Sequence, residues 1–165
     1  MRIYWVSKYL IGIPIKLLDS DKHEVGELNS SRSKTFLKVN YQGKQFQIDY
    51  KDGPSLNNLA KPIELRVIDE KGSEQSSILN RQWLKDIEIK IQSGETFIMR
   101  PRGFPLGILY PYFEIILEDR KIGEFKENVI ALSKRGYLDL DDSQSKNTAL
   151  IVSVLYLGIN DRILS

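Results

Sequence analysis

The sequence predicts a mainly β domain whose sheet curls around one buried C-terminal helix. Between residues 12 and 140, almost every periodic stretch alternates apolar and polar residues, which is the pattern of half-buried strands. Residues 149–159 follow a polar run and are apolar on every face, and such a helix must be buried on every face. Since 165 residues suit one domain, we expect a single domain over residues 1–165 with its central helix at about 145–159.

The clearest strand pair flanks the dipeptide Gln42–Gly43. Residues 35–41 and 44–50 both alternate apolar and polar side chains, and two residues ending in glycine are a strong hairpin signal. Residues 87–91 and 96–100 alternate in the same way around a turn that contains glycine. In total the chain holds roughly ten to twelve short strands by this pattern.

A weak internal repeat is superimposed on these strands. Each unit consists of a strand, an acidic turn and a second strand, with a glycine near the turn or near the start of the second strand. Any meander of hairpins has a similar pattern, so the repeat has this simpler interpretation as well. The units cover residues 15–28, 65–79 and 114–125, and their aspartates Asp19, Asp69 and Asp119 fall at equal intervals.

The composition leaves little material for catalysis. The chain has no cysteine and one histidine, so it lacks the residues for disulfides, thiolate chemistry, a Ser-His-Asp triad or a zinc site of the usual kind. Asp19, Asp21 and His23 could hold a metal ion, but a solvated hairpin turn is the simpler interpretation. The carboxylates near residues 118–119 and 139–142 could do acid–base work, but a turn and a helix N-cap explain them equally. We expect no enzyme activity, no cofactor and no metal.

The location of the protein is also suggested by the sequence. The N-terminal residues lack the apolar core and cleavage site of a signal peptide. The C-terminal apolar run is shorter than the roughly 20 residues that cross a bilayer. We therefore expect a cytoplasmic protein without a transmembrane segment, and the abundance of Lys, Ile and Asn is typical of a bacterial genome rich in A and T.

A basic stretch between residues 29 and 51 is the first candidate binding site. It has only one acidic residue, and its lysines alternate away from the apolar face of the predicted hairpin. Such a surface could hold phosphates or anionic lipid headgroups, since each cation near a membrane contributes about 1 kcal/mol. A solvated hairpin whose charges keep the protein soluble is the alternative. The candidate anion-binding residues are Arg32, Lys34, Lys38 and Lys44.

The segment 100–112 is the second candidate. It places apolar and aromatic residues beside two arginines, which suits insertion into a membrane interface or contact with a protein partner. The alternative is a connection that folds back and closes one end of a barrel. The candidate contact residues are Arg100, Arg102, Phe104, Leu106 and Tyr110. No compact cluster of aromatic and basic residues indicates single-stranded nucleic acid, so we expect no nucleic-acid partner.

Two strand–Asp–turn–Gly–strand units, residues 17–28 and 116–125, together with the final apolar segment 149–159, resemble the tubby C-terminal domain superfamily. That group also contains the LURP-one-related proteins and the phospholipid scramblases. The resemblance implies a closed antiparallel barrel of twelve strands with the C-terminal helix threaded through it. It also implies a lipid-interacting or membrane-associated module. The Lys–Arg pair of tubby proteins has no clear match in this sequence and their C-terminal signature is absent, so phosphoinositide specificity does not follow, and the chain resembles a divergent bacterial branch.

Two functions remain open from the sequence. The first is a non-enzymatic binding module that docks peripherally on anionic lipid surfaces through the basic hairpin. The second is a cytosolic protein-interaction module that uses the apolar segment 100–112. Docking on lipid should weaken steeply with salt, whereas an apolar protein contact should not.

Overall fold

The computed structural model describes residues 1–8, 14–30, 37–50, 63–80, 86–103, 112–130 and 133–159. This part of the chain contains twelve strands followed by one short 3-10 helix and one α-helix. They are β1 (Arg2–Lys8), β2 (Ile15–Leu18), β3 (Glu24–Ser30), β4 (Leu37–Tyr41), β5 (Lys44–Tyr50), β6 (Ile63–Asp69), β7 (Glu74–Asn80), β8 (Ile87–Ile91), β9 (Thr96–Arg102), β10 (Tyr112–Leu117), β11 (Arg120–Ile130), β12 (Ser133–Leu140), η2 (Asp142–Gln144) and α1 (Thr148–Ile159).

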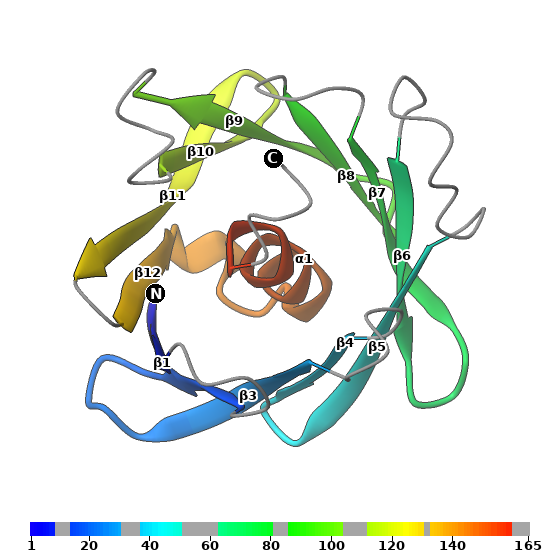
Figure 1. Ribbon diagram of the computed structural model, residues 1–165. Helices are drawn as coiled ribbons and strands as arrows, with labels where there is room; N and C mark the ends of the chain where they lie inside the picture. Colours follow the sequence, from blue (N-terminus) through cyan, green and yellow to red (C-terminus); the bar gives the residue numbers. More distant parts are fainter. Residues whose placement is uncertain are drawn as a thin grey trace.

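The strands form one closed antiparallel barrel (Figure 1). Each strand pairs with its neighbours in the sequence, and β1 closes the ring by pairing with both β2 and β12. An even number of strands allows every neighbouring pair to be antiparallel, and closure leaves no free edge for pairing with another chain. The predicted fold class, a mainly β barrel of about twelve strands around a C-terminal helix, is therefore confirmed.

Helix α1 runs through the inside of the barrel and packs against β4, β6, β7, β8 and β11. Every residue from Leu150 to Gly158 is buried, as its apolar sequence predicts. The helix begins at Thr148, later than the predicted residue 145. The side-chain oxygen of Asn147 accepts a hydrogen bond from the backbone N–H of Leu150 at 3.1 Å, so Asn147 is the N-cap, and neither Asp141 nor Asp142 has that role.

Close packing on one side of the helix depends on the absence of a side chain at Gly158. A Cβ atom placed there would lie 2.4 Å from the ring of Phe125. The ring of Phe125 also stacks on Trp5, with 5.9 Å between the ring centroids. Trp5 and Phe125 are fully buried. The glycine therefore allows the helix to lie directly against the β1–β11–β12 side of the wall.

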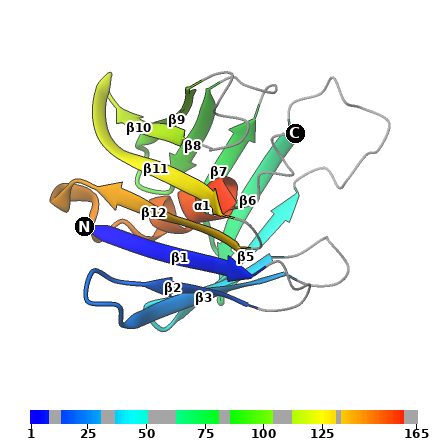
Figure 2. The same cartoon turned by 60° about the vertical axis from the view of Figure 1, so that its left-hand side comes forward.

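The two ends of the barrel differ. Strand direction alternates around the ring, so the connections that follow even-numbered strands all lie at one end, which we call the turn end (Figure 2). The connections that follow odd-numbered strands all start and finish at the opposite end, which we call the connection end. The residues of those connections lie almost entirely outside the described part of the chain.

The internal repeat has a structural basis in the barrel. The pairs β2–β3, β6–β7 and β10–β11 each contain one register shift. At the shift, the carbonyl oxygens of Val25, Gln75 and Ile122 each accept a hydrogen bond from the residue that follows β4, β8 or β12, at 2.8, 2.9 and 2.8 Å. The barrel is therefore built from three similar four-strand units, with β1 completing the third.

The repeat is less regular at its turns. Asp19 accepts hydrogen bonds from the backbone N–H groups of Asp21 and His23, and Asp69 accepts them from Lys71 and Ser73, all at 2.9 Å. Asp119 instead lies in a two-residue turn with a φ of 62°. Of the three equally spaced aspartates, only Asp19 and Asp69 therefore occupy equivalent turns.

One repeat position fixes how the helix is oriented inside the barrel. The residues after the three register shifts are Gly26, Ser76 and Gly123. A Cβ atom at Gly26 or Gly123 would lie 2.1 or 2.4 Å from a backbone oxygen of the neighbouring strand. Ser76 is buried, and its hydroxyl lies 2.7 Å from the hydroxyl of Ser153 on α1. Only one of the three repeat units offers α1 this buried polar contact, and the contact therefore favours one orientation of the helix inside the barrel.

Candidate functional site

The structure places two of the four basic residues that the sequence groups together, Lys38 and Lys44. Arg32 and Lys34 lie outside the described residues. Lys38 is exposed and faces outward from β4, since its neighbour Val39 is buried in the core. Lys44 is the first residue of β5, at the turn end. Lys38 pairs with Gln47, three residues further along β5, which is about 10 Å at the rise of a strand. Lys38 and Lys44 therefore do not share one face.

Lys44 lines a pocket of about 230 Å³ at the turn end. The pocket lies beside the N-terminus of α1, and Lys71 also contributes to its wall. The carboxylates of Asp69 and Glu70 line it as well, and Asp69 accepts a hydrogen bond from Gln75 at 2.8 Å. Because two carboxylates line the pocket together with the two lysines, it does not favour an anion as the sequence-based hypothesis for Lys44 requires.

The two predicted arginines of segment 100–112 are held by carboxylates. The guanidinium of Arg100 donates to both oxygens of Asp86, at 2.8 to 3.1 Å. Arg102 donates to Glu114 at 2.7 Å, and this hydrogen bond lowers the pKa of Glu114. Phe104, Leu106 and Tyr110 lie outside the described residues. An anionic ligand at either arginine would have to compete with a carboxylate of the protein.

Asp19, Asp21 and His23 do come together, as a metal site would require. One ligand atom of each lies within 4.8 Å of the others. However, Asp19 already accepts two backbone hydrogen bonds in this turn. The matching turn at Asp69 forms the same bonds with Lys71 and Ser73 in the corresponding places. The geometry is therefore explained by the turn itself.

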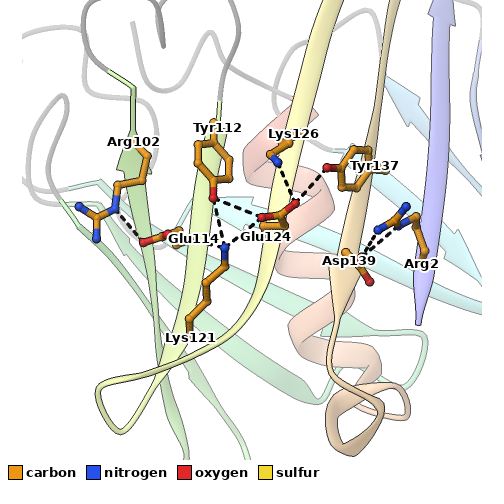
Figure 3. Close-up of polar contacts among 9 residues, drawn as sticks. All are labelled: Arg2, Arg102, Tyr112, Glu114, Lys121, Glu124, Lys126, Tyr137 and Asp139. Atoms are coloured by element: carbon orange, nitrogen blue, oxygen red, sulfur yellow. Dashed lines mark hydrogen bonds and ion pairs between the residues drawn. The ribbon is translucent and has the colours of Figure 1, made fainter.

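A polar network on the outer wall was not predicted from the sequence (Figure 3). Side chains from five neighbouring strands, β9 to β12 and β1, interact across it in two rows set by the strand register. We call this surface the Glu124 wall. Its members are Arg2, Arg102, Tyr112, Glu114, Lys121, Glu124, Lys126, Tyr137 and Asp139.

Glu124 is the centre of this network. Its Oε2 accepts from Lys121 at 3.0 Å and from the Tyr112 hydroxyl at 3.2 Å. Its Oε1 accepts from the Tyr137 hydroxyl at 2.9 Å and lies 2.9 Å from the ammonium of Lys126. Burial alone would raise the pKa of Glu124, but the hydrogen bonds from Lys126, Lys121 and Tyr137 outweigh it and lower the pKa to about 2. The same contacts raise the pKa of Lys121 and Lys126.

The network depends on the third register shift. Residues three apart on a regular strand point to opposite faces, so Lys121 and Glu124 could not meet. The shift at Ile122 adds one residue to β11, which returns Glu124 to the outer face beside Lys121. It also sets Glu124 directly opposite Glu114 and Asp139. Like charges in that position destabilise a sheet, and the surrounding cations offset this repulsion.

The cations lie over the carboxylates. The side chains of Arg2, Arg102, Lys121 and Lys126 are 40 to 49% exposed, whereas those of Glu114 and Glu124 are 20% exposed. Lys126 also lies over the ring of Tyr112, 4.8 Å from its centroid, and Arg2 lies at the same distance over Tyr137. The outermost layer of the Glu124 wall is therefore cationic and aromatic. In the sequence, tyrosines at outward-facing strand positions are the one signal that could have indicated it.

Comparison with models of protein families, with curated proteins and with solved structures finds no match to this chain. Among the described residues, no helix has the length and apolar character needed to cross a membrane.

Because of this network, we expect the free energy of unfolding to depend on pH in the acid range. The pKa of Glu124 is about 2 in the folded protein and near 4.5 when the chain is unfolded. The stability that the Glu124 carboxylate contributes is therefore fully present above pH 4.5 and is lost as the pH falls from 4.5 towards 2. We expect Glu124→Gln to lower the free energy of unfolding by about 2 kcal/mol at pH 7 and to reduce its acid dependence.

Urea unfolding from pH 7 to pH 2.5 measures this effect. Glu70→Gln, on the exposed β6–β7 turn, is the control and should change the free energy of unfolding by less than about 0.5 kcal/mol. Equal stability of Glu124→Gln and the unmodified protein at pH 7 would show that the network is energetically neutral.

Proposed function

We propose that this protein is a non-enzymatic binding module that docks on anionic membrane surfaces with the connection end of its barrel. One observation carries the proposal. The segments that join strands at the connection end hold six basic residues and two acidic ones, whereas those at the turn end, including the link to α1, hold three basic residues and eight acidic ones. The basic residues of the connection end are Arg32, Lys34, Lys51, Lys61, Arg81 and Lys85.

The barrel topology supports treating the two predicted sites as one surface. The segment with Arg32 and Lys34 joins β3 to β4, and the apolar segment with Phe104 and Leu106 joins β9 to β10. Both connections start and finish at the connection end. Cations beside apolar and aromatic side chains suit the interface of an anionic bilayer, where charge attracts and apolar groups insert.

The acidic turn end supports the same orientation. Its connections would be repelled by an anionic surface, so the barrel should approach with the connection end first. Lys38 is exposed near that end and has no ion pair among the described residues. Lys44 lies at the turn end, and we leave it out of the proposed docking surface.

A binding role fits the chemistry of the described carboxylates better than catalysis does. A general acid or base works best with a pKa near the working pH. Glu124, the most strongly engaged carboxylate, has a pKa of about 2 and lies on an outer wall. Near neutral pH the Glu124 carboxylate therefore carries no proton to donate and is only a weak base.

The same proposal extends to the family. A twelve-strand closed barrel around a C-terminal helix is what the resemblance to the tubby-like superfamily implies, and we propose that the chain is a divergent bacterial member of it. The protein would then be cytoplasmic and would bind peripherally at the membrane.

Co-sedimentation with vesicles tests the proposed docking. We expect binding to vesicles that contain anionic lipid, no binding to neutral vesicles, and a steep loss of binding between low and physiological salt. Arg32→Gln combined with Lys34→Gln should weaken binding about 30-fold, since each cation contributes about 1 kcal/mol.

Lys22→Gln combined with Lys44→Gln is the matched control, because it removes two lysines from the turn end. This control should bind as the unmodified protein does. No binding to anionic vesicles at low salt would refute membrane docking. The alternative is a protein partner that binds at the apolar segment 100–112. Its binding should not weaken as the salt concentration rises, and that result would favour the alternative.

A further inference from the structure

We propose that the Glu124 wall is a separate docking surface, which binds an extended acidic segment of a partner protein that bends around the outside of the barrel. The proposed surface differs from the membrane-docking end, because the wall runs along the sides of β9 to β12 and β1, and only Arg102 and Tyr112 border a connection at that end.

The charge that the wall presents to a partner is positive. Four cations and three carboxylates belong to it, and the side chains of the cations are more exposed than those of the carboxylates. Arg135 extends the cationic layer, since it is exposed beside Tyr4 and Tyr137 and has no ion pair among the described residues. Val6, which is directly opposite Arg135, is 42% exposed and adds an apolar contact. Arginine and tyrosine are residues that protein interfaces favour.

The cations are already held in place before a partner binds. Arg102 is fixed by Glu114, Arg2 by Asp139, and Lys121 and Lys126 by Glu124. The rings of Tyr112 and Tyr137 support Lys126 and Arg2 from below. A partner therefore meets cations whose side-chain freedom is already restricted, which reduces the entropy lost on binding.

The spacing of the cations fits an extended polypeptide. Arg102 on β9 and Lys126 on β11 share one row across the strands, with Tyr112 of β10 between them. Arg2 of β1 belongs to the neighbouring row, opposite Asp139, and reaches over the ring of Tyr137. Neighbouring strands are about 4.8 Å apart, so Arg102 and Lys126 stand about 10 Å apart. A chain in the extended polyproline II conformation rises about 3.1 Å per residue with three residues per turn, so an acidic side chain at every third position would face the wall at about this spacing.

The curvature of the wall distinguishes this partner from a membrane. The row crosses five of the twelve strands and so follows about a third of the circumference of the barrel. A flat bilayer can touch a cylinder only along a narrow strip. A flexible segment can follow the curve and reach Arg102, Lys126 and Arg2 together.

Fluorescence anisotropy with labelled synthetic peptides tests the inference. The probe is a twelve-residue peptide with Glu at every third position and Ser elsewhere, and its control has the same residues with the glutamates grouped at one end. We expect the spaced peptide to bind at low salt at least tenfold more tightly than the grouped one. Arg102→Gln combined with Lys126→Gln should weaken its binding at least tenfold.

Two further variants separate loss of the surface from loss of the fold. Lys71→Gln removes a cation from the exposed β6–β7 turn, away from β9 to β12 and β1, and it should leave binding unchanged. Exchange of Arg2 and Asp139 keeps their ion pair but moves the cation to β12, and it should weaken binding while thermal stability is kept. Absence of binding at low salt, equal binding of both peptides, or equal binding by all folded variants would overturn the inference. The inference would also be overturned if variants of the Glu124 wall lost binding to anionic vesicles but kept binding to the peptide.

Discussion

Leu155→Asp is expected to abolish the folded state. Leu155 lies in the middle of α1 and has no exposed surface. A carboxylate at this position would be enclosed by apolar side chains, and an uncompensated buried charge costs several kcal/mol. The total stability of a domain is only about 5–15 kcal/mol. Circular dichroism and size-exclusion chromatography should show an unfolded or aggregated protein.

Two other variants make this result specific for the threaded helix. Leu155→Ala should stay folded and lose about 2–5 kcal/mol, as large-to-small changes in a core do. Val6→Asp places the same charge on the outer wall, opposite Arg135 and Lys16, and should leave the protein folded. A soluble, cooperatively folded Leu155→Asp protein would contradict the burial of the helix inside the barrel.

Gly158→Ala is expected to lower the free energy of unfolding by about 1–3 kcal/mol, because the added methyl group would overlap the ring of Phe125. The ring cannot move away freely, since Phe125 is fully buried and stacks on Trp5. If this contact is the cause, Phe125→Leu should relieve part of the cost.

A double-mutant cycle measures that relief. The combined variant Gly158→Ala with Phe125→Leu should be more stable than the sum of the two single effects predicts, by at least about 0.5 kcal/mol. Strict additivity would show that Gly158 and Phe125 do not constrain each other. The control pair is Gly158→Ala with Leu65→Ala, because the buried Leu65 is on β6, five strands from β11 around the barrel, and the two effects should add.

The sequence predicts the architecture well because each signal is local. Alternation over five to seven residues identifies the strands, and continuous apolarity over residues 149–159 identifies a helix buried on every side. The start of the helix was less predictable. Asp141 and Asp142 are good N-cap residues by type, but Asn147 takes that role because the chain first makes the short turn η2.

The surfaces were harder to predict, because they depend on strand register. Lys38 and Lys44 are close in the sequence, yet one faces outward from β4 and the other lies at the turn end. Arg100 and Arg102 are set beside apolar residues in the sequence, but the partners that hold them, Asp86 and Glu114, come from other segments.

The Glu124 wall shows the same difficulty most clearly. Its members come from strands that are more than 120 residues apart along the chain, as the pair Arg2 and Asp139 illustrates. One extra residue in β11 decides whether Glu124 faces outward. Neither closure of the barrel by β1 and β12 nor a register shift can be read from alternation alone.

The central claim is that the connection end of the barrel docks on an anionic membrane, and a label at each end tests it most directly. The chain has no cysteine, so Ser33→Cys in the β3–β4 connection and Ser93→Cys in the β8–β9 turn each provide one attachment point for a polarity-sensitive fluorophore. With anionic vesicles at low salt, we predict a blue shift and increased emission from the label at position 33 and no change at position 93. A change at position 93 alone, or at neither position, would contradict the account.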